Sequence, residues 1–132
     1  ADDHYMLAFG RPDTWSLKYN LIWDKVFGSN LFSEKVFETE LLWYIKNTNQ
    51  YGTPLDNRKD ISKTDWILWC AAMADNKEQF QKLLEPVAYY LEHTESRVPF
   101  GDYYDTVTGK HERFVGRSVQ GGIFMPMFIR CR

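Results

Sequence analysis

The densest group of side chains that could do chemistry lies in the stretch SRVPFGDYYD. Its guanidinium offers a planar fork of donors that suits a carboxylate, and its carboxylates and phenol hydroxyls can move protons or bind polar ligands. Long connections between helices are often functional. The stretch is either part of a site or a solvated loop whose arginine pairs with an aspartate. The residues that carry these groups are Arg97, Asp102, Tyr103, Tyr104 and Asp105.

A second polar stretch, YGTPLDNRKD, contributes Asp56 and Arg58. Both stretches follow predicted helices that run in the same direction of an antiparallel series. We therefore expect residues 51–61 and 96–112 to lie side by side. Asp56 and Asp102 would then form an acid–base pair of the kind that activates water.

Metal and nucleophile motifs give little further direction. Asp102, Asp105 and His111 are residue types that bind metals, but their spacing matches no metal motif. A divalent metal is possible, and no other cofactor is expected. The sequence contains no HExxH, P-loop or GxGxxG pattern. His4 and His93 are expected to be structural or solvated.

Length and composition indicate one globular domain over residues 1–132, with 44% hydrophobic residues and a net charge of −2. That charge argues against a simple nucleic-acid clamp. The tail is nevertheless basic, since residues 96–132 carry 6 Lys and Arg against 3 Asp and Glu. Two cysteines, Cys70 and Cys131, exclude a disulfide scaffold, and a bridge between them is left open. No apolar run has membrane-spanning length, so no membrane partner is expected.

Hydrophobic periodicity predicts an all-α fold of about five helices in antiparallel hairpins, without a strand. Capping boxes are predicted at the third and fourth helices, with Asp65 reaching back to the Ser62 N–H in the first of them. The apolar end of the last helix is expected to be buried. The predicted helices begin near residues 12–14, 33, 62, 75 and 114, and the first, second and last end near residues 28, 50 and 130.

Several longer motifs resemble the C-terminal region of the fungal glutaminase A family. They are KYNLIWDK, YGTPLDNR, KTDW, SRVPFGDYYDT and RSVQGG, in this order. The resemblance runs from about residue 8 to residue 124. It implies part of an α/α toroid of helical hairpins, a secreted protein, and hydrolysis of glutamine to glutamate. The chain would be either a piece of a longer protein or a stand-alone homologue.

Under this resemblance the reaction is hydrolysis of an amide bond. An aspartate such as Asp56 or Asp102 would activate water, and Arg97 or Arg58 would hold the substrate carboxylate. Tyr104 would donate a hydrogen bond to the developing oxyanion. The complete candidate set is Asp56, Asp102, Asp105 and Tyr104 for catalysis and Arg58, Arg97, Arg117 and Tyr103 for substrate binding.

Two other functions are consistent with the sequence. A small secreted fungal defence protein could cleave RNA with the basic tail and with Asp102, Asp105 and His111. A non-catalytic module could instead bind carbohydrate or protein through exposed aromatic residues. For assembly, we expect a compact monomer in preference to a symmetric homodimer.

Overall fold

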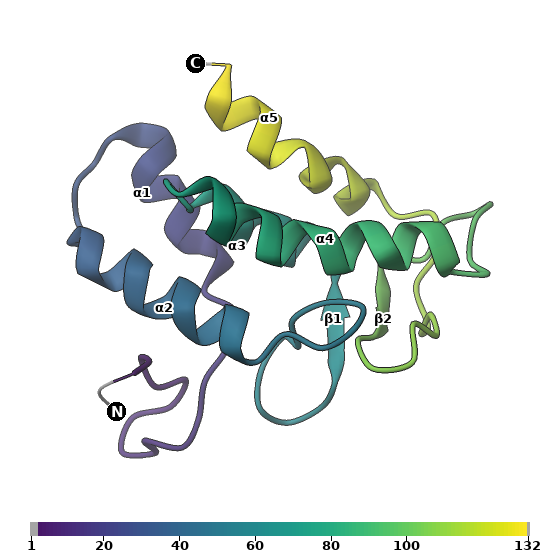
Figure 1. The fold of residues 1–132 in the computed structure, drawn as a ribbon, viewed down its shortest axis with the longest axis horizontal. Helices are drawn as coiled ribbons and strands as arrows, with labels where there is room; N and C mark the ends of the chain where they lie inside the picture. Colours follow the sequence, from purple (N-terminus) through teal and green to yellow (C-terminus); the bar gives the residue numbers. More distant parts are fainter. Residues whose placement is uncertain (1–2, 132) are drawn as a thin grey trace.

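The computed structural model describes residues 3–131 and shows a mainly helical molecule with one small sheet (Figure 1). The five α-helices of the described residues agree with the predicted number, but the all-α prediction missed an antiparallel pair of strands. The elements are η1 (Tyr19–Leu21), α1 (Ile22–Phe27), α2 (Glu34–Lys46), β1 (Ile61–Lys63), α3 (Thr64–Ala72), α4 (Lys77–His93), β2 (Tyr103–Asp105), η2 (Ser118–Phe124) and α5 (Met125–Arg130), where η denotes a 3-10 helix.

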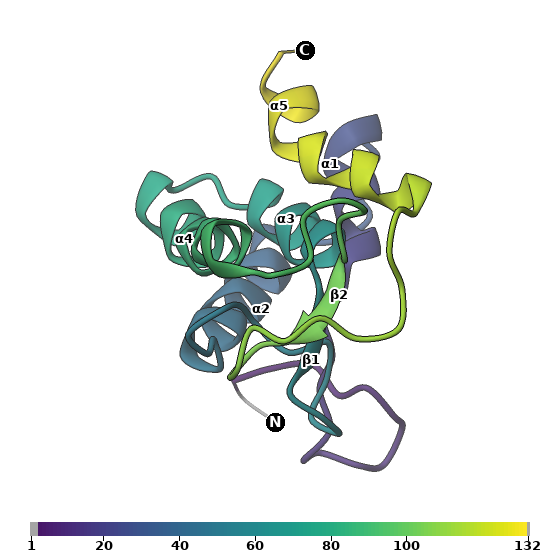
Figure 2. The ribbon, with the colours of Figure 1, turned by 90° about the vertical axis from the view of Figure 1, so that its right-hand side faces the viewer.

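Helix α3 is the centre of the fold, because α4, η2 and α5 all pack against it (Figures 1 and 2). Its sequence is apolar on nearly every side, which is typical of a helix that is surrounded by protein. Ile67, Cys70 and Ala71 are completely buried in it. Cys70 is a free thiol, as is the exposed Cys131, so the two do not form a bridge. Within residues 3–131, every helix is too short or too polar to cross a membrane.

Residues 12–18 do not form the first part of a helix, contrary to the prediction. The backbone N–H of Leu17 donates to the carbonyl of Leu55 at 2.7 Å, and that of Trp15 donates to Oδ1 of Asn57 at 3.1 Å. Both side chains are buried. Because these N–H groups bind partners distant in sequence, the segment does not form a helix, and helical structure begins only at Tyr19.

A buried carboxylate anchors the N-terminal segment to α2. Glu40 is completely buried, and it accepts hydrogen bonds from the backbone N–H of Tyr5 at 2.7 Å and from Nζ of Lys18 at 3.0 Å. The hydroxyl of Tyr44 donates a third hydrogen bond to it. A buried charge is tolerated when it is paired and hydrogen-bonded in this way.

The predicted capping box at Ser62 is wrong, because Ser62 belongs to β1 and lies opposite Tyr104 of β2. Helix α3 begins at Thr64, with Lys63 in the cap position and no side-chain cap. The N–H of Thr64 donates instead to the carbonyl of Asp102 at 3.1 Å. Asp65 is therefore not a capping residue.

The cap of α4 is also displaced by one residue from the predicted box. Oδ1 of Asn76, not the side chain of Asp75, accepts hydrogen bonds from the N–H groups of Glu78 and Gln79. The start of the helix was thus placed correctly, but the residue that caps it was not.

The expectation that residues 51–61 and 96–112 lie side by side is confirmed. Strands β1 and β2 join them, with Ile61 opposite Asp105. Beyond the sheet, the N–H of Thr106 donates to the carbonyl of Asp60 at 2.7 Å, and the carbonyl of Thr106 accepts from the N–H of Tyr51 at 2.9 Å.

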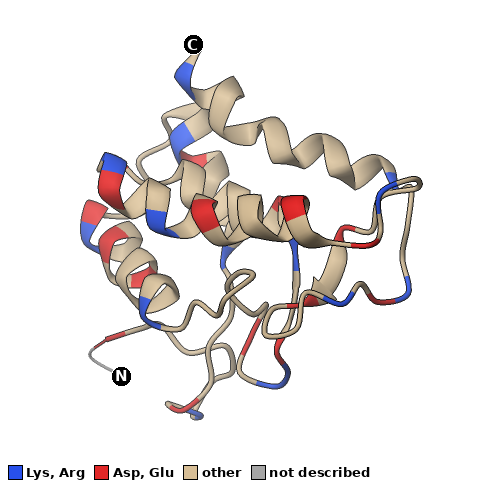
Figure 3. Ribbon diagram, turned by 45° about the vertical axis from the view of Figure 1, so that its right-hand side comes forward, with Lys and Arg blue, Asp and Glu red and all other residues tan. Residues whose placement is uncertain are grey.

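The predicted last helix is divided into the 3-10 helix η2 and the short helix α5. Residues 118–129 contain no charged side chain, and this part of the ribbon is uniformly uncharged in Figure 3. The prediction that its end is buried is only partly correct, because α5 turns one face to the core with Met125 and Pro126. The other large apolar side chains of this end are exposed, with exposed fractions of 58% for Phe124, 63% for Met127 and 51% for Phe128.

Candidate functional site

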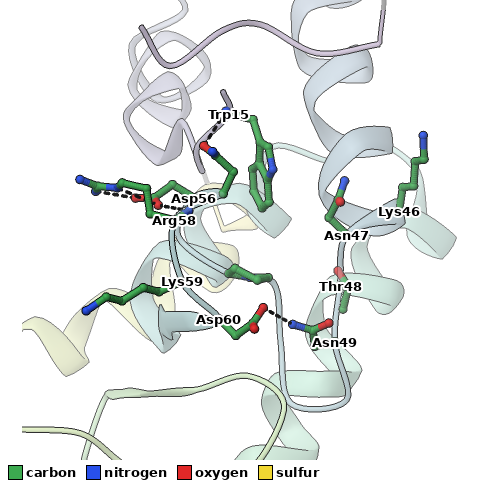
Figure 4. A pocket seen from close by; sticks show the side chains of 11 residues that line it. Trp15, Lys46, Asn47, Thr48, Asn49, Asp56, Arg58, Lys59 and Asp60 are labelled. Carbon is green, nitrogen blue, oxygen red and sulfur yellow. Dashed lines mark hydrogen bonds and ion pairs between the residues drawn. The ribbon is translucent and has the colours of Figure 1, made fainter. Parts of the chain in front are cut away.

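A polar cavity of about 370 Å³ lies between the turn after α2 and the loop before β1 (Figure 4). We call it the polar cavity. Its size is in the lower range of small-molecule sites. It is lined by Trp15, Lys46, Asn47, Thr48, Asn49, Pro54, Asp56, Asn57, Arg58, Lys59 and Asp60.

Side-chain hydrogen bonds hold the turn after α2, which lines the polar cavity. Nδ2 of Asn49 donates to Oγ1 of Thr106 at 2.9 Å and to Oδ1 of Asp60 at 3.3 Å, the second of which is drawn in Figure 4. The hydroxyls of Thr48 and Thr53 are 2.7 Å apart. The bond to Asp60 fixes this turn against the loop that carries Asp56, and the bond to Thr106 fixes it against the segment after β2.

Asp56 and Arg58 form a bidentate ion pair at the edge of the polar cavity (Figure 4). Nε of Arg58 is 2.9 Å from Oδ1 of Asp56, and Nη2 is 2.6 Å from Oδ2. Hydrogen bonding from Arg58 lowers the pKa of the Asp56 carboxyl. The side chain of Asp56 is only 12% exposed, whereas that of Arg58 is 75% exposed. The carboxylate is therefore a fixed acceptor, and the guanidinium remains accessible.

A second cavity of about 260 Å³ adjoins the polar cavity, and Asp56, Arg58 and Lys59 line both of them. Tyr103 of β2 lines the second cavity. The ion pair therefore lies between the two cavities, and we call it the Asp56–Arg58 ridge. Three residues that the sequence predicted for the site, namely Asp56, Arg58 and Tyr103, are brought together here.

Asp102 and Arg117 are also joined, but at the other end of the sheet. Asp102 is completely buried, and both of its oxygens accept from the Arg117 guanidinium, with Nε 3.1 Å from Oδ1. The loop of Asp56 is attached at the opposite end, where the N–H of Leu55 donates to the carbonyl of Ile61. The structure thus does not support the predicted Asp56–Asp102 acid–base pair.

The hydroxyl of Tyr104 is committed to the fold and not to a site. Tyr104 is completely buried, its ring stacks on that of Tyr90 at 3.6 Å, and its hydroxyl donates to the carbonyl of Tyr51 at 2.8 Å. Burial raises the pKa of the Tyr104 phenol well above its usual value. The predicted role as a donor to an oxyanion does not fit this position.

Two further predicted residues hold turns together. Oδ1 of Asp105 accepts from the N–H groups of Val107 and Thr108 at 2.9 and 2.8 Å. Nη2 of Arg97 donates to the carbonyl of Glu92, a residue in the last turn of α4, at 2.6 Å. Neither side chain lines the polar cavity.

The predicted metal ligands do not assemble. Within residues 3–131, no group of three or more His, Cys, Asp or Glu side chains is arranged to hold a metal ion. The reason is visible for two of the candidates, because Asp102 is paired with Arg117 and Asp105 closes a turn. His111 lies opposite Tyr104 in an isolated bridge, and its side chain lines another cavity.

Asp65 is the carboxyl group that the sequence interpretation missed. It is 7% exposed, and its Oδ1 has no hydrogen-bond partner among the described residues. Burial, together with the nearby charge of Asp102, raises the pKa of the Asp65 carboxyl. A buried acid with this property is a candidate for proton transfer. Its position in the KTDW motif is the sequence signal for it, although a capping role also accounts for an aspartate at this position.

Comparison with known proteins identifies the family. The family described as "Glutaminase A six helical-hairpin domain" matches residues 1–127. Glutaminase A of Aspergillus oryzae is 35% identical over 131 residues, which cover 96% of this chain and 19% of that protein. A probable glutaminase of Arthroderma benhamiae is 29% identical over 93 residues, which cover 68% of this chain and 11% of that protein.

No solved structure matches the chain. The chain spans about a fifth or less of the length of these curated relatives, so the similarity concerns one region of much longer proteins. That region was expected from the motifs quoted above, and the match extends over nearly the whole sequence. The chain belongs to the family of the glutaminase A six helical-hairpin domain.

Proposed function

We propose that the chain takes part in hydrolysing the side-chain amide of glutamine to glutamate, as the helical-hairpin region of a glutaminase A enzyme. The observation that carries the proposal is the 35% identity to glutaminase A over 96% of the chain. The polar cavity supports it, because a hollow of about 370 Å³ with charges of both signs suits a free amino acid.

The Asp56–Arg58 ridge can bind both charged groups of an amino acid. A substrate carboxylate would take the guanidinium of Arg58 in the bidentate geometry that Asp56 now occupies. The carboxylate of Asp56 would then accept from the substrate ammonium group. Because the Asp56 side chain is only 12% exposed, the exchange requires the substrate ammonium group to replace the positive charge of Arg58. Asp56 thereby has a binding role in place of the predicted activation of water.

The neighbouring side chains suit the amide end of glutamine. Asn47 and Asn49 both line the polar cavity, and their amide nitrogens donate within the fold to the carbonyl of Trp43 and to Asp60 and Thr106. Each side chain keeps its amide oxygen as an acceptor. The amide nitrogen of glutamine would donate to these oxygens.

The test is calorimetric titration of the chain with L-glutamine, together with an assay of ammonia release. Arg58→Lys keeps the charge but removes the fork, so we expect the Kd for glutamine to rise by about tenfold or more. Arg97→Lys is the matched control outside the polar cavity, and it should leave the Kd unchanged. The proposal fails if the chain does not bind glutamine, or if the two variants behave alike.

A further inference from the structure

A separate cavity of about 380 Å³ lies between the end of α4 and the loop that follows β2. It shares no lining residue with the polar cavity. We call it the histidine cavity, because two of its residues are histidines from distant parts of the chain. It is lined by His93, Glu95, Thr108, Gly109, Lys110 and His111.

The loop on one side of the histidine cavity has a fixed path. Gly109 has a φ of 73°, and a Cβ atom at this position would be 2.9 Å from Cε1 of Tyr51. The ring of Tyr51 thus supports the loop from below, and only glycine fits against it. The turn also satisfies its own backbone, since the N–H of Gly109 donates to the carbonyl of Asp105 at 2.9 Å. Lys110 and His111 follow directly from this rigid turn.

The ring of His93 is held in a defined orientation. Its Nδ1 is 2.8 Å from the carbonyl oxygen of Tyr89, and a carbonyl can only accept, so Nδ1 carries a hydrogen. Nε2 is therefore an acceptor in the neutral ring and becomes a donor only when the ring is protonated. The ring also lies 3.9 Å from that of Tyr89.

The other donors of the histidine cavity are side chains. The N–H groups of Val107 and Thr108 are already bound to Asp105, so the backbone of the turn does not offer them to a ligand. Oγ1 of Thr108 accepts from the N–H of Lys110 at 3.3 Å, which leaves the hydroxyl hydrogen for another acceptor. Lys110 brings three donors and a positive charge. Glu95 is the one acidic side chain in the lining.

We propose that the histidine cavity binds a phosphate group, with Lys110, His111 and protonated His93 as charged donors. Charge-assisted hydrogen bonds of this kind suit phosphate oxygens. Glu95 opposes the anion, so binding requires the histidines to be charged and strengthens as the pH falls from 7.5 to 5.5. A small phosphate compound fits better than RNA, because basic and acidic residues are interspersed along the ribbon (Figure 3) and the net charge is −2.

The first experiment is an NMR titration of the chain with inorganic phosphate and with sulfate at both pH values. Sulfate keeps its charge over this range, so any pH dependence of its affinity comes from the protein. We expect saturable shifts of the His93, Lys110 and His111 signals, with a Kd at least about fivefold lower at pH 5.5. Absence of saturation, or equal affinity at both pH values, would overturn the proposal.

Two variants that should change the Kd for sulfate in opposite directions make the test specific. Lys110→Gln should raise the Kd for sulfate by about tenfold, and Glu95→Gln should lower it at pH 7.5. Lys59→Gln removes the same charge in the polar cavity and should leave the Kd for sulfate unchanged. Equal effects of the two lysine variants would mean a diffuse attraction and would refute a site.

A last set of titrations, with an RNA oligonucleotide and with glutamine, distinguishes a small phosphate compound from RNA. It also tests phosphate binding separately from the proposed glutamine binding. Tighter binding of an RNA oligonucleotide than of phosphate, or its cleavage, would refute the small-compound assignment. The histidine cavity does not depend on the proposed glutamine binding. Glutamine should shift signals of the polar cavity alone, so either proposal can fail while the other stands.

Discussion

The buried carboxylate of Asp102 receives two hydrogen bonds from the guanidinium of Arg117, which precedes η2. The carbonyl of the same residue, Asp102, accepts from the first N–H of α3. One residue thus joins the end of the sheet, the start of the central helix and the segment that leads to the C-terminal elements. The pair explains why two residues predicted for a substrate site are instead part of the framework.

Arg117→Ala should lower the free energy of unfolding by about 3–5 kcal/mol, because it leaves the Asp102 carboxylate buried without a partner. Urea unfolding monitored by tryptophan fluorescence measures this loss. Arg97→Ala is the control, since Arg97 is exposed and loses one hydrogen bond at the surface. A loss of less than about 1 kcal/mol in Arg117→Ala would show that the pair is not structural.

Asp65→Asn should change how stability depends on pH. Burial and the Asp102 charge raise the pKa of the Asp65 carboxyl in the folded chain above its value of 3.8 in the absence of these effects. Folding therefore takes up a proton, and this group's contribution to stability falls as the pH rises from 3.8 through the higher folded value. The Asn variant mimics the protonated acid.

The unfolding free energies of the wild type and of Asp65→Asn should be compared by urea titration at several pH values. We expect the variant to be the more stable protein at neutral pH, with a difference that shrinks toward pH 3.8. The lost cap predicted from the sequence would have the opposite effect. A variant that is less stable at every pH would restore that interpretation.

The parts of the fold that depend on neighbouring residues in the sequence could be predicted. Hydrophobic periodicity placed α2, α3 and α4, and Gly28 ended α1 as expected, with a left-handed φ of 63°. Residues 12–18 were predicted wrongly because their conformation depends on distant partners such as Leu55 and Asn57. Three-residue strands are likewise too short to leave a periodic pattern.

The sequence predicted residue types of the site correctly, but it did not predict which side chains pair with each other. The loops that carry Asp56 and Asp102 do lie together, but each aspartate is bound by an arginine at its own end of the sheet. Sequence spacing cannot show which arginine reaches which aspartate. The histidine cavity was missed for the same reason, since His93 and His111 belong to different elements.

Tyr104→Phe should reduce stability and leave catalysis unaffected. Without its hydroxyl the carbonyl of Tyr51 loses its donor inside the protein, which costs about 1–3 kcal/mol. Tyr103→Phe is the control, because Tyr103 is only half-buried, and its effect should stay below about 0.5 kcal/mol. The measurements are urea unfolding and ammonia release from glutamine per folded molecule. Loss of ammonia release at unchanged stability would assign Tyr104 to the oxyanion after all.

Gly121 and Gly122 provide a matched pair for the contact between η2 and α3. A Cβ on Gly122 would be 2.9 Å from both Cβ of Asp65 and Nε1 of Trp69, whereas one on Gly121 would meet nothing within 4 Å. The carbonyl of Gly122 also accepts from Nε1 of Trp69 at 2.9 Å. An added methyl group at Gly122 must therefore push η2 away from α3 and weaken this hydrogen bond.

Gly122→Ala should lower the free energy of unfolding by about 1–3 kcal/mol through overpacking. Gly121→Ala should be neutral or stabilising by up to about 1 kcal/mol, because it restricts the unfolded chain without a clash. Urea unfolding gives both values, and the indole N–H signal of Trp69 in NMR spectra reports the hydrogen bond directly. If that signal moved equally in the two variants, or if both lost the same stability, η2 would not be packed on α3 through Gly122.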